Sequence, residues 1–299
     1  NFFVNILIRT EIFMLAYFDC FSGISGDMTL AALIDLGVPL KYLEDRLNSI
    51  PLSDFDITVT PVYRNGIHAM SVSVGAYDDQ TTRNFADIRS LIMDCPLSER
   101  IKSTSLQIFK KLASAEARIH SCSAEEVHFH EVGAVDAIVD IVGSAIGLQL
   151  LEIQDVVSAP LPLSAGMTRS SHGSIPLPAP ATVQILAGHP VRNADSDREL
   201  VTPTGAAIAA TVARFGPMPE MTIDRTGYGV GGWDLEDRPN LLRGILGRRG
   251  PAATFAQDSV TVIETHIDDS SAELLGALID RLISDGALDA ALSPLLMKK

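Results

Sequence analysis

The stretch that decides the fold is HFHEVGAVDAIVDI, residues 128–141. From Val132 to Ile146 the chain is almost wholly apolar apart from Asp136 and Asp140, which is typical of a buried helix. Four residues apart, the two carboxylates lie on one face of that helix, about 6 Å from each other. Ionised carboxylates in an apolar setting cost several kcal/mol each unless something neutralises them. The pattern therefore implies a metal ion or a basic partner.

Possible metal ligands also stand immediately before this helix, at His128, His130 and Glu131. In an extended His-x-His segment both imidazoles point to the same side. Together with the aspartates they supply nitrogen and oxygen donors that suit nickel, zinc or manganese. We therefore predict that some of these five residues bind a metal. The alternative is structural, because a helix can also bury an aspartate such as Asp140 that caps another helix or pairs with an arginine.

The composition indicates a globular protein of about two domains. The chain has 299 residues, 46% of them hydrophobic and 20% charged, which allows two cores of ordinary size and excludes a disordered chain. Its formal charge is -14 and its pI is near 4.8. Nucleic acid and anionic membranes bind basic patches, so a cation or a small molecule is the expected partner.

The spacing of the cysteines and the lack of a recognisable membrane span or secretory signal predict a cytoplasmic protein. Cys20, Cys95 and Cys122 stand far apart without a Cys-x-x-Cys spacing, so neither a disulfide framework nor a thiolate zinc site is expected. No run approaches the ~20 apolar residues of a membrane span. Residues 1–13 are apolar but lack the basic start and cleavage site of a secretory signal. We interpret them as an extension without function.

A glycine-rich turn follows the first predicted strand, residues 15–19. The turn is CFSGISGD, residues 20–27, and a helix is expected over residues 28–36. Backbone N–H groups at such a helix start can hold an anion, although no Walker loop is present because no Gly-Lys-Ser/Thr follows. The candidate anion-binding residues are Gly23, Ser25 and Gly26.

Two other interpretations of this turn stay open. Asp19 and Asp27 could face a cation, or Ser25 and Asp27 could simply cap the helix. A second helix start has Thr202 as the expected cap and Pro203 at the first helical position. Its free N–H groups make the segment near Thr204 a second possible anion seat, although capping alone also explains these residue types.

Periodicity and turn residues predict the remaining elements. An Asn-Gly pair at residues 65–66 predicts a hairpin, and alternate prolines after His172 predict an extended segment. The glycines of residues 227–232 lack the following helix of a dinucleotide loop, so we reject that interpretation. The expected helices are residues 39–47, 85–93, 99–120, 181–187 and 271–284. The expected strands are residues 56–63, 67–76, 156–163, 241–246, 259–266 and 287–293, of which 156–163 is interrupted by Pro160 and Pro162.

These elements predict an α+β fold. A mixed sheet with flanking helices is expected over residues 14–246, followed by a linker over residues 247–258. Residues 259–299 are expected to begin a second α+β domain of ferredoxin-like type. Because about 40 residues are too few for an independent domain, we expect the sequence to stop inside it.

Several blocks of the sequence together resemble the LarC family, the nickel-insertion proteins that complete the nickel-pincer cofactor of lactate racemase. The resemblance runs in order from Met14 to the end of the chain. The blocks that carry it are Phe18–Met28, His128–Ile141, His172-Gly173 with its alternate prolines, Glu199–Ala207, and Ile267-Asp268-Asp269 with Met297-Lys298-Lys299.

The resemblance implies a nickel-inserting cyclometallase of the lyase class. Such a protein places Ni(II) into pyridinium-3,5-bisthiocarboxylic acid mononucleotide, forming nickel–sulfur and nickel–carbon bonds while consuming CTP with Mn²⁺ or Mg²⁺. The CTP site of the family lies in the carboxy-terminal domain, where Asp268, Asp269, Glu273, Lys298 and Lys299 match its pattern. The implied partners are nickel and the pincer ligand, with the apo racemase and a second copy of the chain as further candidates.

Residue roles follow as hypotheses. His128, His130 and Glu131 deliver the metal, and Asp136 orients a ligand or binds a cation. Either His172 or Glu131 is the base that removes the ring proton. The turn from Gly23 to Gly26 and the helix start at Thr204 seat the phosphate of the ligand. Two other functions use the same residues: a nickel chaperone or store without catalysis, and a metal-dependent phosphohydrolase.

Overall fold

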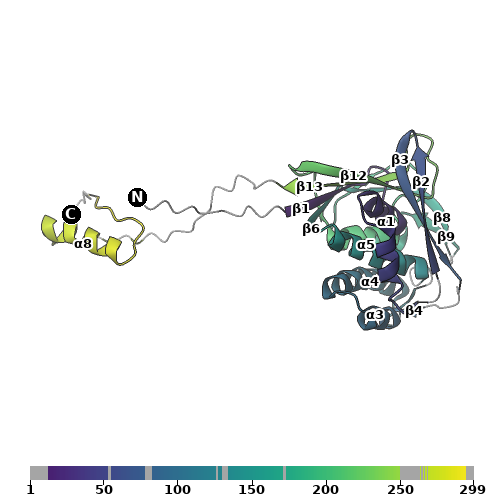
Figure 1. Ribbon diagram of the computed structural model, residues 1–299, viewed down its shortest axis with the longest axis horizontal. Coiled ribbons are helices and arrows are strands. Elements are labelled where there is room, and N and C mark those ends of the chain that lie inside the picture. Colours follow the sequence, from purple (N-terminus) through teal and green to yellow (C-terminus); the bar gives the residue numbers. More distant parts are fainter. Residues whose placement is uncertain are drawn as a thin grey trace. The chain divides into compact units, whose positions relative to one another are not determined.

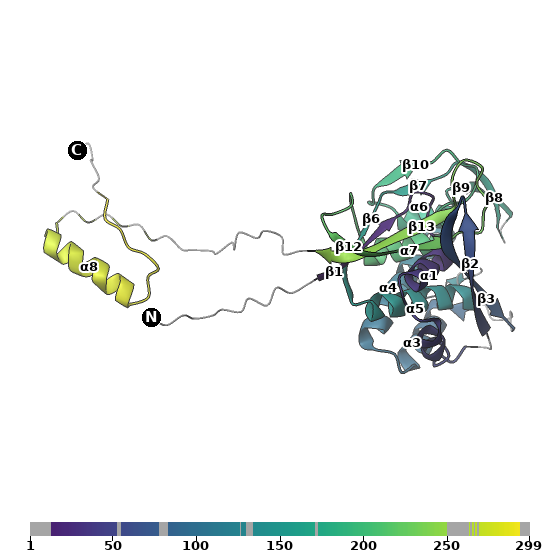
Figure 2. The same ribbon diagram turned by 45° about the horizontal axis from the view of Figure 1, so that its top comes forward.

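The chain divides into two compact units, residues 1–252 and 253–299. The computed structural model describes residues 13–52, 55–77, 83–125, 127–129, 134–170, 173–249, 263, 265, 267 and 269–293. In the first unit, helices pack against one face of a mixed sheet (Figure 1). The helices α1 (Gly26–Asp35) and α5 (Val135–Leu150) lie nearer the sheet than α3 (Phe85–Asp94) and α4 (Glu99–His120) do, as Figure 2 also shows.

The sheet has seven strands in the order β11-β6-β1-β13-β12-β3-β2. At its centre β1 runs parallel to β6 and antiparallel to β13. This mixed sheet confirms the predicted α+β class. The strands are β1 (Phe13–Asp19), β2 (Phe55–Arg64), β3 (Ile67–Ala76), β6 (Ile153–Ser158), β11 (Arg214–Phe215), β12 (Thr222–Val230) and β13 (Leu241–Arg249).

The central strand β1 is buried on both faces. Because successive side chains of a strand point to opposite faces, Ala16 and Phe18 join the main core. Leu15 and Tyr17 join a smaller apolar cluster with Ile245 and Val157. An apolar run that has no polar face is typical of a strand in this position.

The predicted helices of the first unit are confirmed, with ends that differ by a few residues. Ser98 and Thr202 are the caps that the sequence predicted, and their hydroxyl oxygens accept hydrogen bonds from the N–H groups of Ile101 and Gly205. The helices are α1 (Gly26–Asp35), α2 (Leu40–Leu47), α3 (Phe85–Asp94), α4 (Glu99–His120), α5 (Val135–Leu150), α6 (Pro180–Ile185) and α7 (Pro203–Val212). No helix in the described part of the chain is long and apolar enough to cross a membrane.

Glycines allow α1 to lie directly on the sheet. Gly227 and Gly229 belong to β12, and a Cβ atom added at Gly229 would be 1.9 Å from the carbonyl oxygen of Met28 in α1. A Cβ at Gly227 would be 2.6 Å from the carbonyl oxygen of Ala32. The glycines of residues 227–229 therefore serve close packing of a helix on a strand, and rejection of the dinucleotide loop agrees with the structure.

The strand-like segment predicted over residues 156–163 is interrupted near Pro160 as expected, although its first part begins at Ile153. It forms two strands, β6 and β7 (Leu161–Leu163), and β7 pairs with β10 (Val191–Asn193). Pro160 and Pro162 lack the N–H groups that would continue a ladder. The proline-rich segment after His172 is extended as predicted, because β9 (Gly173–Leu177) pairs with β8 (Gly166–Ser170).

Two short strands complete the first unit, β4 (Arg83–Asn84) and β5 (His128–Phe129), which pair with each other. The described cysteines are free, with Cys20 and Cys95 buried and Cys122 exposed.

The described part of the second unit contains the helix α8 (Ala272–Ser284), capped by the hydroxyl of Ser271. The strand predicted over residues 287–293 is wrong, since these residues form no strand. A strand needs a partner to satisfy its backbone groups, and α8 is the only regular element among the described residues of this unit. The strand predicted over residues 259–266 falls mostly outside the described residues.

Candidate functional site

The helices α1 and α7 begin side by side. The backbone N–H of Ile24 donates to the carbonyl of Leu200 at 2.9 Å, and that of Thr202 donates to the carbonyl of Ile24 at 3.2 Å. A Cβ atom at Gly205 would lie 2.2 Å from the carbonyl oxygen of Ile24. Any residue with a Cβ atom would clash here. Glycine at position 205 therefore allows the two helix starts to lie this close together.

Both helix starts carry the caps that their sequences predict. The Ser25 hydroxyl oxygen accepts a hydrogen bond from the N–H of Met28, and the Thr202 hydroxyl oxygen accepts one from the N–H of Gly205. The N-terminus of a helix carries a partial positive charge. Two such ends therefore meet at one place and favour negative charge there.

A carboxyl group of α5 lies against the start of α1. A Cβ atom at Gly26 would be 2.5 Å from Oδ2 of Asp140 and 2.9 Å from the methyl carbon of Thr204. The other carboxyl oxygen of Asp140, Oδ1, is buried and has no hydrogen-bond partner among the described residues. A buried polar atom without a partner is rare in a folded protein, and water or an ion is one way to satisfy it.

The pKa values of Asp140 and Asp27 also indicate that no cationic side chain neutralises these carboxyl groups. The pKa of Asp140 is raised well above its ordinary value by burial first, and then by the charges of Asp27 and Asp136. Burial also raises the pKa of Asp27, although hydrogen bonds from the Ser25 hydroxyl and backbone N–H groups oppose this. No basic side chain contributes to either shift. Within the described part of the chain, this carboxylate cluster of Asp27, Asp136 and Asp140 has no cationic partner.

The prediction that both aspartates of α5 are buried is met only in part, by Asp140, which is half-buried as a residue and has a fully buried Oδ1. Asp136 is exposed, and its Oδ1 accepts a hydrogen bond from the N–H of Ala137 at 2.8 Å. Its position in the first turn of α5 places it at the solvent edge of the cluster. The cation that Asp19 faces is the guanidinium of Arg243 on β13, with which its carboxylate pairs.

The structure brings together the predicted residues of the anion seats. Gly23 follows the turn after β1, Ser25 and Gly26 begin α1, and Thr204 lies in the first turn of α7, beside Gly26. A bare phosphate at these helix ends would, however, meet the carboxylates of Asp27 and Asp140. Helix dipoles alone do not explain how an anionic ligand would be held here.

The remaining predicted residues are not brought together within the described part of the chain. His128 lies in β5, and Asp269 is exposed in the second unit. Five predicted residues fall outside the described residues: His130, Glu131, His172, Asp268 and Lys298. Among the side chains that the structure describes, no three of the types His, Cys, Asp and Glu are grouped closely enough to hold a metal ion.

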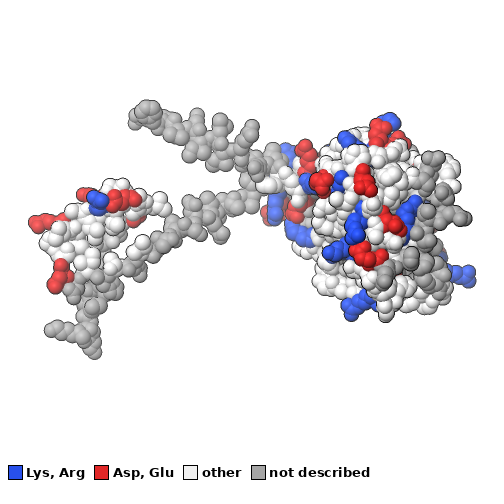
Figure 3. All heavy atoms as spheres, turned by 90° about the horizontal axis from the view of Figure 1, so that it is seen from below, with Lys and Arg blue, Asp and Glu red and all other residues white. Residues whose placement is uncertain are grey.

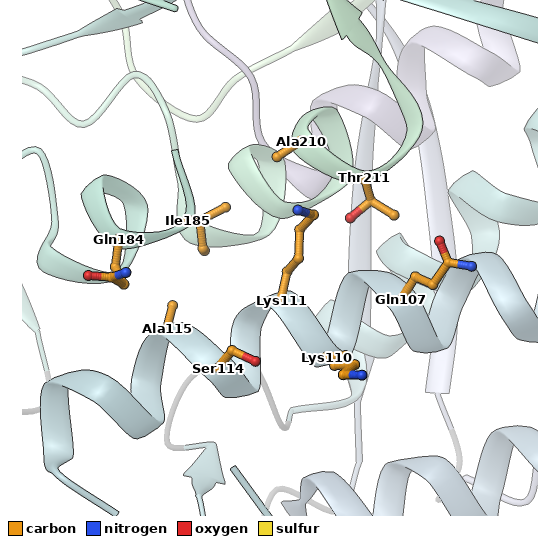
Figure 4. A pocket seen from close by; sticks show the side chains of 9 residues that line it. All are labelled: Gln107, Lys110, Lys111, Ser114, Ala115, Gln184, Ile185, Ala210 and Thr211. Carbon is orange, nitrogen blue, oxygen red and sulfur yellow. The ribbon is translucent and has the colours of Figure 1, made fainter. Parts of the chain in front are cut away.

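A hollow of about 520 Å³ lies elsewhere in the first unit, between α4, α6 and α7. Lys111 reaches from α4 across it towards α7 (Figure 4). Its lining includes Gln107, Gln184 and Thr211 but no carboxylate. The face seen in Figure 3 carries basic and acidic side chains intermixed, without a large patch of one sign. We therefore take the carboxylate cluster as the candidate site, because its carboxyl groups have no cationic partner among the described residues.

Sequence reasoning named Asp27 and Asp140 but did not join them. Asp27 was one alternative for a cation contact, and Asp140 was one half of the pair on its own helix. Their proximity depends on the packing of α1 against α5, where Gly143 and Gly147 allow close contact with leucines of α1. The small residues of α5 on that face are the only local signal for this packing.

Comparison with known proteins gives a consistent result. The family model described as nickel insertion protein matches residues 16–299. A protein of Geotalea uraniireducens (strain Rf4), named "Putative nickel insertion protein", is 48% identical over 288 residues, which cover 95% of this chain and 73% of that protein. A protein of the same name from Dictyoglomus thermophilum (strain ATCC 35947 / DSM 3960 / H-6-12) is 44% identical over 284 residues, 95% of this chain and 73% of that protein. No solved structure matches the chain.

Proposed function

Because the chain belongs to the nickel insertion protein family, we propose that it inserts Ni(II) into pyridinium-3,5-bisthiocarboxylic acid mononucleotide. The product is the nickel-pincer cofactor of lactate racemase, and the reaction depends on CTP with Mn²⁺ or Mg²⁺. Nickel is the cargo of this reaction. The family supports nickel insertion, and the resemblance of the motif blocks described above supports this particular acceptor.

The chemistry of the acceptor defines what the protein must do. Two thiocarboxylate sulfurs of the pincer ligand replace weaker ligands on nickel, and the ring carbon between them forms the nickel–carbon bond as its hydrogen leaves as a proton. Soft sulfur donors bind nickel firmly once it is presented with open positions. The protein therefore needs a loose metal site, a seat for the ligand and a base for one proton.

We assign these tasks to the residues that the sequence and the family resemblance predict. His128, His130 and Glu131 hold nickel loosely, and Asp136 at the edge of the carboxylate cluster helps to pass it to the ligand. Glu131 or His172 accepts the ring proton. The phosphate of the ligand lies at Gly23, Ser25, Gly26 and Thr204. In the second unit, Asp268, Asp269 and Lys298 hold CTP.

One observation carries the proposal. The buried Oδ1 of Asp140 has no partner among the described residues, and its helix begins directly after the segment with His128, His130 and Glu131. A structural aspartate would be expected to accept a hydrogen bond or to pair with an arginine. A cation bound beside the segment that delivers nickel, either nickel in transit or a divalent ion that assists its insertion, explains why Asp140 does neither.

The test is metallation of the pincer ligand, followed by mass spectrometry after incubation with the protein, nickel and CTP. We expect the His130→Ala and Asp136→Ala variants to metallate at least tenfold more slowly than the parent. The Glu44→Gln variant, altered at a partly exposed residue of α2, is the matched control. Nickel binding without any metallated ligand would indicate a chaperone or store instead. Turnover of phosphoesters without nickel would indicate a phosphohydrolase.

A further inference from the structure

We propose that Asp27 and Asp140 form a binding site for a hard divalent cation, Mg²⁺ or Mn²⁺, separate from the histidine ligands of nickel. The site lies in the first unit, where α1, α5 and α7 meet. It would hold the cation through one carboxylate from α1 and one from α5. Water molecules and an anionic ligand would complete the coordination.

The carboxyl group of Asp140 lacks a hydrogen-bond or ionic partner among the described residues. Its Oδ1 is buried without a partner in the described part of the chain, and its Oδ2 lies against the backbone of Gly26. Asp27 lies next to Gly26 in sequence, and its charge acts on Asp140. An uncompensated buried carboxylate is expensive. A divalent cation between Asp27 and Asp140 would neutralise both.

The second argument is the type of donor. The side chains that meet here offer carboxylate and hydroxyl oxygens, from Asp27, Asp140 and Ser25, and no described imidazole or thiolate contributes to the pKa of either aspartate. Oxygen ligands suit magnesium and manganese, whereas imidazole suits nickel. Mg²⁺ is usually bound through one or two carboxylates while it keeps several waters. Two protein ligands are therefore sufficient, even though no three such residues converge among those described.

The third argument concerns the anion seat. The starts of α1 and α7 attract an anion, yet Asp27 and Asp140 repel one. A divalent cation held by the two carboxylates would reverse the local charge and bridge to a phosphate at the helix ends. This step rests on the proposed function, because it takes the phosphate to be that of the pincer mononucleotide. The cation site itself does not depend on it.

The test measures binding of Mn²⁺ alone to the full chain, without nickel or nucleotide, by the loss of the free Mn²⁺ signal in electron paramagnetic resonance. We expect Asp140→Asn and Asp27→Asn each to weaken binding at least tenfold, while His130→Ala and Glu44→Gln bind as the parent does. Equal binding by the parent and both aspartate variants overturns the proposal. Loss of binding in His130→Ala also overturns it, because the metal site would then be shared with nickel.

Thermal unfolding separates a lost ligand from a damaged fold. Asp140→Asn removes a buried charge, so its midpoint without metal should equal or exceed that of the parent. Mn²⁺ should raise the midpoint of the parent and of Glu44→Gln but not that of Asp140→Asn. An equal Mn²⁺-dependent rise in all three proteins contradicts the site. If Mn²⁺ binds as expected but no ligand is metallated, the proposed function fails and the cation site stands.

Discussion

Asp136 and Asp140 show how much the surroundings of a residue decide its chemistry. They lie four residues apart on one helix, yet Asp136 is exposed and accepts a hydrogen bond from the backbone, whereas Asp140 has a buried oxygen without a partner among the described residues. The first faces water in the first turn of α5. The second is the residue whose charge state should affect the whole fold.

We predict that stability falls with rising pH in the absence of divalent cations, and that Asp140 causes much of this fall. Its pKa is raised in the folded protein by burial and by Asp27 and Asp136, so the folded state holds its proton more tightly than the unfolded state does. Its stabilising contribution is therefore complete below the ordinary pKa of 3.8 and is lost as the pH rises through the folded-state pKa.

Urea unfolding of the parent and of Asp140→Asn between about pH 5 and pH 8, with a metal chelator present, checks this prediction. Relative to the parent, the variant should gain stability as the pH rises, by up to about 1.4 kcal/mol for each pH unit that lies between the ordinary and the folded-state pKa of Asp140. Asp94→Asn, altered at an exposed residue of α3, is the control and should follow the parent. A constant difference across this range would contradict the assignment.

The contact of helix α1 with strand β12 fixes the position of the Asp27 carboxylate, because Asp27 lies in the first turn of α1. A Cβ atom at Gly229 would meet the carbonyl of Met28 at 1.9 Å. Neither backbone can yield without moving α1 off the sheet. We predict that Gly229→Ala lowers the free energy of unfolding by about 1–3 kcal/mol or more. Gly216→Ala is the control, because a Cβ atom there has no neighbour within 4 Å. Equal stability of the two variants in urea unfolding would contradict this packing.

We also predict that the Thr202 cap stabilises helix α7. The Thr202 hydroxyl accepts a hydrogen bond from the N–H of Gly205 at 3.1 Å. Thr202→Ala should cost about 0.5–2 kcal/mol of stability, measured by urea unfolding, and should leave the fold intact by circular dichroism. Thr222→Ala, at an exposed position of β12, should cost less than Thr202→Ala. An equal cost for both would show that the cap contributes nothing.

Local signals explain which elements could be predicted from the sequence. The helix over residues 99–120 was predicted correctly at both ends because a cap, periodicity and the final turn are properties of neighbouring residues. The hairpin around Asn65-Gly66 was found for the same reason. The strand predicted over residues 287–293 failed because a strand depends on a partner that the sequence pattern does not supply.

The site was predictable only in part, because it also depends on contacts between segments that are far apart in the sequence. The resemblance and the residue types drew attention to Ser25, Gly26 and Thr204, and the structure places them together. The juxtaposition of Asp27 and Asp140 joins helices more than a hundred residues apart in sequence. Neither spacing nor periodicity encodes such a contact. Glycines on α5 and β12 permit it, but they become interpretable only once the packing is known.

At the scale of the whole molecule, the order of strands in the sheet shows what the first unit needs. β13 (Leu241–Arg249) lies between β1 and β12, so the end of the unit's sequence pairs with its beginning. We predict that residues 13–252 fold alone as the first compact unit. A chain that stops at Asn240 should not fold, because β1 and β12 would each lose their shared neighbour in the middle of the sheet.

Circular dichroism and urea unfolding of the two shortened chains check this prediction. Residues 13–252 should unfold cooperatively at a urea concentration close to the midpoint of the first unit in the full chain. Residues 13–240 should show no cooperative transition, since an unpaired central strand leaves its buried backbone groups unsatisfied. Cooperative folding of the shorter chain would mean that β13 is dispensable. Failure of the longer one would mean that residues 253–299 contribute to the core, and that the two units do not fold independently.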